Sequence, residues 1–330
     1  MDRRRAFIHL AFALGLWVLA GIAGAATAGA PTELRFDAIG PGSPGCPPTP
    51  GWAAFLKGFK DLGYTTDPII GGGCFSQSNE VPQLVADVLA RKPPLVVVWG
   101  SSVSVRLLRQ SAPTMPIVFV NLGDPVGYGF VQSLSHPGGN ITGIANMTDD
   151  ILAKQVELLR VTLPSATRLA VLCNLSDPEA QVRLQATLSA ARNLNFEAVS
   201  YPVLAPGDYA GAFDAMAKDR MQAVVIIPDP AFYAYREDIV ALASSHRLPL
   251  MSYTIPYADA GGLFVYAANL DDMSYRAAAY VVKILNGAKP ADLPVQRPEK
   301  FDFIVNKKAA RDLGLVLPKE ILLRATRVID

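Results

Sequence analysis

From Glu33 onward, short apolar segments alternate with stretches in which apolar residues recur every three or four positions. Several of the apolar segments are continuous and rich in β-branched residues, which is typical of strands buried on both faces of a parallel sheet. The alternation of strand and helix predicts an α/β protein with right-handed crossovers. We expect strands at Leu34–Ile39, Leu95–Trp99, Pro116–Leu122, Leu169–Cys173, Ala223–Ile227, Leu250–Tyr253, Leu263–Tyr266 and Phe301–Val305.

Three of the stretches between these strands have helical periodicity and an end that the sequence marks. Apolar residues recur in each of them at the spacing expected of a helix that buries one face. A glycine or a proline follows each one, and both residue types favour helix termination. We expect these helices at Trp52–Leu62, ended by Gly63, at Ile151–Leu159, ended by Pro164, and at Met273–Leu285, ended by Asn286 and Gly287.

The strands and helices fall into two series, which predicts two sheets. The first series ends near Gly138–Gly143, where a turn precedes a short strand, and the second runs from Ile151 to about Asp259. The segments Gly261–Gly287 and Phe301–Val305 then return across a hinge. The stretch Gly287–Pro294 is rich in Ala, Pro and Lys and is typical of an exposed linker.

Residues 3 to 30 have the pattern of a bacterial export signal. The arginines Arg3–Arg5 precede an uncharged run, whose apolar core Leu10–Ile22 is short for a membrane span. Small residues follow and offer cleavage frames that end at Ala25 and Ala28. The paired arginines also resemble a twin-arginine signal, which exports folded proteins. We therefore expect a periplasmic protein after cleavage, and the alternative is an uncleaved N-terminal anchor.

Composition restricts the remaining classes of function. The chain is 51% hydrophobic and 18% charged, which suits a compact globular protein. Residues 1–30 contain three arginines and one aspartate, so 27 basic and 28 acidic residues remain after their removal. We therefore expect no basic surface for nucleic acid or anionic lipid. No second apolar stretch reaches the roughly 18 residues of a membrane span, which predicts a soluble protein.

Three cysteines and three histidines favour neither a metal site nor a cofactor site. Cys46 and Cys74 both lie in Gly/Pro-rich segments that we interpret as loops, and a Cys46–Cys74 disulfide is our hypothesis for an oxidising compartment. Cys173 ends a buried-strand pattern and is expected to be a core thiol. His136 precedes a turn, and His246 ends a helical stretch, where a cation favours the helix dipole.

The chain lacks the usual catalytic signatures. Gly100–Ser104 lacks the second glycine of a nucleophile elbow. Gly71–Gly73 is not followed by the third glycine of a dinucleotide fingerprint, and no phosphate-binding Gly-Lys-Ser/Thr sequence occurs. These absences favour a binding protein over an enzyme.

Polar and aromatic residues follow the carboxyl ends of the predicted strands, where ligands bind in open α/β sheets. Ser101 and Ser102 would stand at a helix N-terminus, whose free N–H groups suit a carboxylate. Each candidate also has a plain structural interpretation as a helix cap or turn residue, and for Asp124 the two are evenly balanced. The candidate ligand-binding residues are Ser43, Ser101, Ser102, Asn121, Asp124, Asn174, Asp229, Tyr253 and Tyr266.

Six ordered stretches carry a resemblance to a known family: Phe55–Tyr64, Pro116–Phe119, Asp124–Val131, Ser135–Gly143, Gly261–Leu263 and Val282–Pro294. They resemble the periplasmic substrate-binding proteins of ABC transporters that are related to tryptophan- and tyrosine-binding members. The resemblance covers nearly the whole chain after the signal. The chain departs from the family pattern at Ile39–Pro48, which is rich in proline, and at Gly71–Phe75, and both segments would flank the cleft.

The resemblance implies a type I periplasmic-binding fold, with two doubly wound parallel-sheet lobes joined by a three-strand hinge. It implies lobes at 31–144 plus 265–298 and at 145–264 plus 299–330. Ligand would lie between the lobes and draw them together by hinge closure. The closed monomer would deliver its ligand to a membrane permease driven by a separate ATPase.

The candidate residues suit an amino acid or an aromatic carboxylate as ligand. Ser101 and Ser102 would bind a carboxylate, and Asp124 or Asp229 an ammonium group. A flat apolar surface for a ring would come from Trp99, Phe232, Tyr253 and Tyr266. Two alternatives stay open: a ligand-sensing module for a receptor, which would use the same cleft, and a secreted α/β hydrolase.

Overall fold

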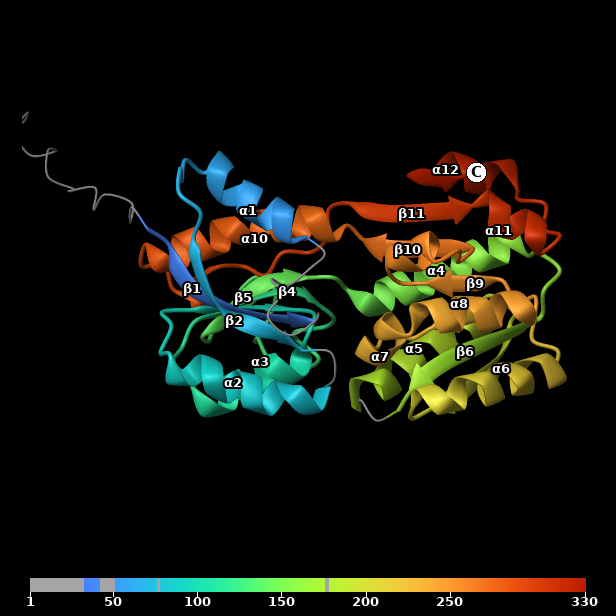
Figure 1. Ribbon diagram of the computed structural model, residues 1–330, viewed down its shortest axis with the longest axis horizontal. Helices are drawn as coiled ribbons and strands as arrows, with labels where there is room; N and C mark the ends of the chain where they lie inside the picture. The colour runs from blue at the N-terminus through green and yellow to red at the C-terminus, as the bar shows by residue number, and fades with distance from the viewer. Residues whose placement is uncertain (1–32, 42–50, 76–77, 176–177) are drawn as a thin grey trace, which may run out of the picture.

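The computed structural model describes residues 33–41, 51–75, 78–175 and 178–330. Over these residues the chain forms two lobes that lie side by side along the long axis of the molecule (Figure 1). Within the described ranges, no helix is long and apolar enough to cross a membrane. The predicted export signal, Ser43 and Cys46 lie outside the described residues.

The first lobe is built on a parallel sheet with the strand order β2-β1-β3-β4-β5. Helices α1 (Trp52–Asp61) and α10 (Leu270–Leu285) pack together on one face, and α2 (Val81–Ala90) and α3 (Ser102–Ser111) cover the other. Because both faces are covered, the central strands are buried over most of their length, which explains why Val96–Trp99 and Ile117–Val120 are continuously apolar. The strands are β1 (Arg35–Pro41), β2 (Ile69–Phe75), β3 (Val96–Trp99), β4 (Ile117–Leu122) and β5 (Ile141–Ala145).

The second lobe is built on a sheet with the strand order β12-β11-β10-β9-β8-β6-β7, in which only the β10–β11 pair is antiparallel among the described strands. Its strands are β6 (Arg168–Asn174), β7 (Glu197–Val203), β8 (Val224–Ile226), β9 (Leu250–Ser252), β10 (Phe264–Ala268), β11 (Phe301–Asn306) and β12 (Arg327–Ile329). One face is covered by α4 (Thr148–Thr162), α5 (Pro178–Asn193), α11 (Lys307–Asp312) and α12 (Lys319–Arg324). The other is covered by α6 (Tyr209–Lys218), α7 (Pro230–Ala234), α8 (Arg236–Ser245) and α9 (Pro256–Asp259).

Three segments of the chain connect the lobes, as the sequence predicted. They run from β5 into α4, from β10 into α10, and from residue 296, which pairs with Ile144 in the first lobe, into β11. Strands β5 and β10 leave their sheets at their carboxyl ends, and β11 begins beside the end of β10, where Phe301 pairs with Ala268. The carboxyl edges of the two sheets therefore face each other across the connection.

All eight strands expected from apolar runs are present, and their bounds differ by a few residues at most. The helix expected from Trp52 ends before Gly63, which adopts a left-handed φ of 93°. The expected lobe boundary at residue 265 falls inside strand β10. This strand pairs with β9 and β11, so it lies wholly in the second sheet. Strands β7 and β12 were not expected. Both lie at edges of the sheet and are only partly buried.

The interpretation of Gly71–Cys74 as a loop is wrong, because these residues form most of β2 beside β1. The glycines allow an unusually close approach of the two strands. Gly72 has a φ of 103°, and a Cβ atom there would lie 1.9 Å from the carbonyl oxygen of Ala38. The segment is therefore a strand whose lack of side chains hides the usual β pattern.

The stretch Gly287–Pro294 is not a free linker, because it packs along the first lobe. The Thr142 hydroxyl donates to the carbonyl of Leu293 (2.6 Å), and the Tyr280 hydroxyl donates to the carbonyl of Pro294. Pro290 is buried at the start of a short 3-10 turn. Its polar, proline-rich composition thus reflects an irregular backbone that is satisfied by side chains of the lobe it covers.

Candidate ligand-binding site at the facing edges of the two lobes

The carboxyl edge of the first sheet brings together segments that are far apart in the chain. Gly40 pairs with Cys74, and Trp99 pairs with Val120, so the ends of four strands lie nearly level. The N-terminus of α3 follows one of these ends directly. Ser43 lies outside the described residues, so its contact with ligand stays a prediction.

Ser101 and Ser102 lie at the N-terminus of α3, as the sequence predicted. The Ser101 Oγ accepts a hydrogen bond from the backbone N–H of Ser104 (3.1 Å) and lies 2.8 Å from the Ser104 Oγ. The Ser101 hydroxyl therefore caps the helix, which is its plain structural role. Ser102 is the first helical residue and is half-buried. It stands at the positive end of the helix dipole, where a ligand carboxylate would be stabilised.

Asn121 and Asp124 both have structural partners at the end of β4. Asn121 adopts a φ of 62°, and its Oδ1 accepts a hydrogen bond from the Asn146 side chain (2.8 Å) at the first connection between the lobes. The Asp124 Oδ1 accepts from the backbone N–H of Val126 (3.1 Å), so this carboxylate holds its own turn. The structure thus supports the structural interpretation of both residues, and their contact with ligand stays a prediction.

In the second lobe, four candidates form a row along adjacent strands. The register pairs Leu172 with Ile226, Val225 with Met251, and Val265 with Ser252. Consequently the side chains that follow these positions lie at one edge of the sheet, opposite the first lobe. The row contains Asn174 at the end of β6, Asp229 after β8, Tyr253 after β9, and Tyr266 in β10.

Asp229 and Tyr253 are directly linked within this row. The Tyr253 hydroxyl donates to the backbone carbonyl of Asp229 (2.8 Å), and burial raises the pKa of Tyr253 far above its usual value. The Asp229 Oδ1 accepts from the backbone N–H of Ala231 (2.8 Å) and caps α7. The hydroxyl thus fixes the backbone that carries the carboxylate, and it positions Asp229 at the edge of the sheet.

Tyr266 lies within β10 rather than at the end of a strand. Its ring stacks on Phe301 with the planes 2° apart and the centroids at 5.7 Å. The two rings line a cavity of about 190 Å³, together with Met147 and Arg297 from the connecting segments. Tyr266 therefore lies at the hinge, where it packs against the cores of both lobes.

Trp52 is a candidate that the sequence analysis missed. Trp99 is 3% exposed, and its Nε1 donates to the Ser274 hydroxyl (3.2 Å), so it is a core residue. Phe232 is fully buried as well. Trp52, the first residue of α1, is half-buried and packs on Trp99 with the ring centroids 5.8 Å apart. A tryptophan at the start of the helix after β1 was the available signal, because that helix begins at the carboxyl edge.

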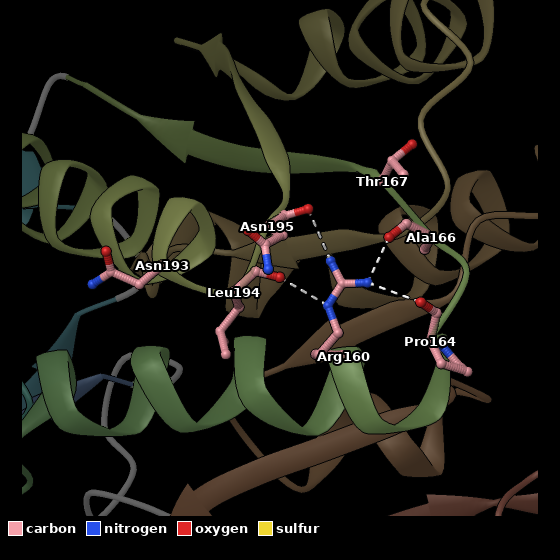
Figure 2. A pocket seen from close by; sticks show the side chains of 7 residues that line it. All are labelled: Arg160, Pro164, Ala166, Thr167, Asn193, Leu194 and Asn195. Atoms are coloured by element: carbon pink, nitrogen blue, oxygen red, sulfur yellow. Dashed lines mark hydrogen bonds between the residues drawn. The ribbon is translucent and has the colours of Figure 1, made fainter.

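A larger cavity, of about 420 Å³, lies in the second lobe at the ends of α4 and α5 (Figure 2). Arg160 lines it, and the Arg160 guanidinium donates to the carbonyls of Leu194 (2.9 Å), Pro164 (3.2 Å), Ala166 (2.7 Å) and Asn195 (3.2 Å). Backbone carbonyls thus stabilise the positive charge of Arg160, and these hydrogen bonds link the C-terminal end of α4 to that of α5. The cavity is structural rather than a binding site.

Cys173 and His246 lie where the sequence predicted, in a buried strand and at a helix end. Cys173 is a fully buried free thiol, and burial raises its pKa to about 11. Cys74 is buried and disulfide-bonded. Its proposed partner Cys46 lies outside the described residues, so the Cys46–Cys74 pairing stays a prediction. Thiol titration of the unfolded, unreduced protein should then find one free thiol. His246 ends α8, and the described residues contain no cluster of potential metal ligands.

Comparison with known proteins adds a family. A family model described as ABC transporter substrate binding protein matches residues 52–329. A tyrosine-binding protein of Clostridioides difficile strain R20291 is 22% identical over 265 residues, which cover 79% of this chain and 75% of that protein. This family consists of binding proteins, so the hydrolase alternative does not hold.

Solved structures show the same fold at low sequence identity. An ABC domain from Streptococcus pneumoniae in complex with L-Trp has a TM-score of 0.79 at 22% identity, over 90% of this chain and 100% of that one. A conserved domain protein from Vibrio cholerae has a TM-score of 0.80 at 23% identity, over 90% and 99%. These likenesses confirm the two-lobed, type I periplasmic-binding fold that the sequence predicted.

Proposed function

Because the chain belongs to the ABC transporter substrate-binding protein family, we propose that it is the solute-binding component of an importer. It captures a small molecule between its lobes and delivers it, by hinge closure, to a membrane permease driven by a separate ATPase. The export signal predicted at residues 3–30 supports a periplasmic location. The protein acts as a monomer, since each molecule carries both walls of its cleft.

One observation carries this proposal: the carboxyl edges of both sheets face each other, and both edges carry polar candidates. Ser102 at the start of α3 lies on the first edge, and Asp229 lies on the second. A ligand with a carboxylate at one end and an ammonium group at the other matches the positive end of the α3 dipole at Ser102 and the carboxylate of Asp229.

An aromatic amino acid is the ligand class that we propose. Trp52 stands at the first edge, beside the helix that would bind the carboxylate, and Tyr253 stands at the second. Aromatic side chains offer a flat apolar surface on which a ligand ring packs. The tyrosine-binding relative and the L-Trp complex point to the same class.

Calorimetric titration of the mature protein, stripped by unfolding and refolding, tests both levels of the proposal. The probes are L-tryptophan, L-tyrosine, L-leucine, the desamino analogue indole-3-propionate, and tryptamine, which lacks the carboxylate. We expect saturable binding of the aromatic amino acids and a large loss of affinity for each truncated analogue. Equal affinity for L-tryptophan and indole-3-propionate would refute a contact between the protein and the ammonium group of the ligand.

Asp229→Asn isolates the charge of that carboxylate, because asparagine caps a helix as well as aspartate does. The variant should bind L-tryptophan roughly tenfold or more weakly and bind indole-3-propionate unchanged. Asp208→Asn is the matched control. Its Oδ2 accepts from the N–H groups of Leu204 and Ala205 at an exposed turn of the same lobe, so the substitution should leave both affinities unchanged.

A further inference from the structure

Away from the three connecting segments, α3 of the first lobe contacts α5 of the second. Arg106 on α3 of the first lobe donates from its Nη2 to the Oε1 of Glu179 on α5 of the second (3.1 Å). These residues are 73 positions apart in the chain. The contact is therefore a bond between lobes rather than a local helix pair.

A second bond between the lobes lies beside the first. Arg183, one turn further along α5, donates from its Nη2 to the Tyr128 hydroxyl of the first lobe (3.0 Å). The same guanidinium pairs with the Oε2 of Glu179 (2.9 Å). The carboxylate of Glu179 thus pairs with one arginine of each lobe, and the four side chains form a continuous network.

The network is partly buried, and two of its bonds depend on the distance between the lobes. The side chains of Glu179 and Arg183 are 7% and 11% exposed, and that of Arg106 is 43% exposed. The pair on α5 is independent of the lobe arrangement, since its members lie four residues apart on one helix. The bond to Arg106 forms only when α5 lies against α3, and the bond to Tyr128 forms only when α5 lies against the segment that follows β4.

Arg109 shows how a similar residue on α3 behaves without reaching across. Its guanidinium lies over the Phe130 ring at 5.6 Å, and that of Arg106 lies over the same ring at 5.4 Å. The Arg109 Nη1, however, donates to the backbone carbonyl of Gly129 in its own lobe. The two arginines therefore share their helix and their aromatic partner and differ in the lobe that they contact.

We propose that Arg106, Tyr128, Glu179 and Arg183 form an interlobe bridge that holds the lobes in the ligand-binding arrangement and so sets the affinity of the cleft. These are positioning residues, because they act on the distance between the two walls rather than on the ligand. The role rests on the proposed function, since it concerns the same cleft. A protein whose competent arrangement is less populated binds its ligand more weakly by the same factor.

The test compares Arg106→Met with its control Arg109→Met in the mature, ligand-stripped protein. Small-angle X-ray scattering gives the radius of gyration with and without saturating L-tryptophan, and calorimetry gives the Kd for L-tryptophan. Arg106→Met should enlarge the ligand-free protein, return to the wild-type size with ligand, and weaken binding by roughly tenfold. Arg109→Met should match the wild type in all three measurements.

Tyr128→Phe is the second variant, because it removes one hydroxyl and keeps the ring that packs near Phe130 (6.0 Å between centroids). It should shift the size and the Kd in the same direction by a smaller factor. Wild-type size and affinity in both Arg106→Met and Tyr128→Phe would overturn the bridge. If the wild type binds none of the amino acid probes, the proposed function fails, and the ligand-free scattering still decides for or against the bridge.

Discussion

Replacing Arg160 with lysine should lower the free energy of unfolding of the second lobe by about 2 kcal/mol. The guanidinium donates four hydrogen bonds to backbone carbonyls and lies 3.6 Å from the centroid of the Phe196 ring. An ammonium group at the end of a flexible chain reaches one or two of these carbonyls, because its donors point from a single atom. Two or three bonds are then lost at about 1 kcal/mol each, and water partly replaces them at this half-exposed site.

Thermal unfolding by circular dichroism measures the effect. A loss of about 2 kcal/mol corresponds to a fall in Tm of roughly 4–8 °C for a lobe of this size. Arg160→Met removes every one of these hydrogen bonds, and also the cation that lies over the Phe196 ring, and should lower the Tm further. Arg192→Lys, at an exposed position near the end of α5, is the matched control and should leave the Tm unchanged.

An Arg160→Lys variant with the Tm of the wild type would contradict this reasoning. It would mean that solvent or a rearranged loop satisfies the carbonyls at the ends of α4 and α5 as well as the guanidinium does. Affinity for ligand is the second readout. It should be unchanged in both variants, because this cavity lies within the second lobe at the ends of α4 and α5, away from the facing edges.

Two further predictions concern pH and backbone geometry. The Asp214 carboxylate, 2.9 Å from the His246 Nε2, raises the pKa of His246 above 6.5. The stability that this pair contributes is therefore present below pH 6.5 and is lost as the pH rises through the higher folded-state pKa. Asp214→Asn should lower the His246 pKa measured by NMR, and an unchanged value would exclude the pair. Gly72→Ala should destabilise the first lobe by about 2 kcal/mol or more in chemical denaturation, because the alanine Cβ would clash with the carbonyl oxygen of Ala38. Gly139→Ala is the control and should not destabilise it, since a Cβ atom there meets no atom within 4 Å. Equal unfolding midpoints for the two variants would refute the close approach of the strands.

Most of the fold follows from local pattern, and the exceptions have physical causes. The central strands are predictable because a strand covered on both faces must be apolar at every position, as Val96–Trp99 is. β2 escapes the pattern, since its glycines replace the apolar side chains where two backbones approach closely. β7 escapes it because an edge strand is only partly buried and tolerates polar residues.

The candidate site was predictable to the level of the sheet edge and no further. The rule that ligands bind at carboxyl edges led to Ser102 and Asp229, and both do follow strands that end at the facing edges of the two sheets. Their contact with ligand stays a prediction. The same rule cannot separate a ligand contact from a cap, and Ser101 and Asp124 proved to have capping and turn roles. Trp52 was missed because a half-buried aromatic residue at a helix start has the same local pattern as a core residue.

The order of apolar runs, the glycine and proline positions and the N-terminal arginines determine an α/β protein of two lobes with a predicted export signal. These features are local, and a strand or a helix start leaves its mark on a few consecutive residues. No local pattern indicates that α3 packs against α5, because Arg106 and Glu179 are 73 positions apart and lie in different lobes. Only the folded chain decides which charges of one lobe meet those of the other, since that depends on the sum of many packing contacts rather than on any single segment.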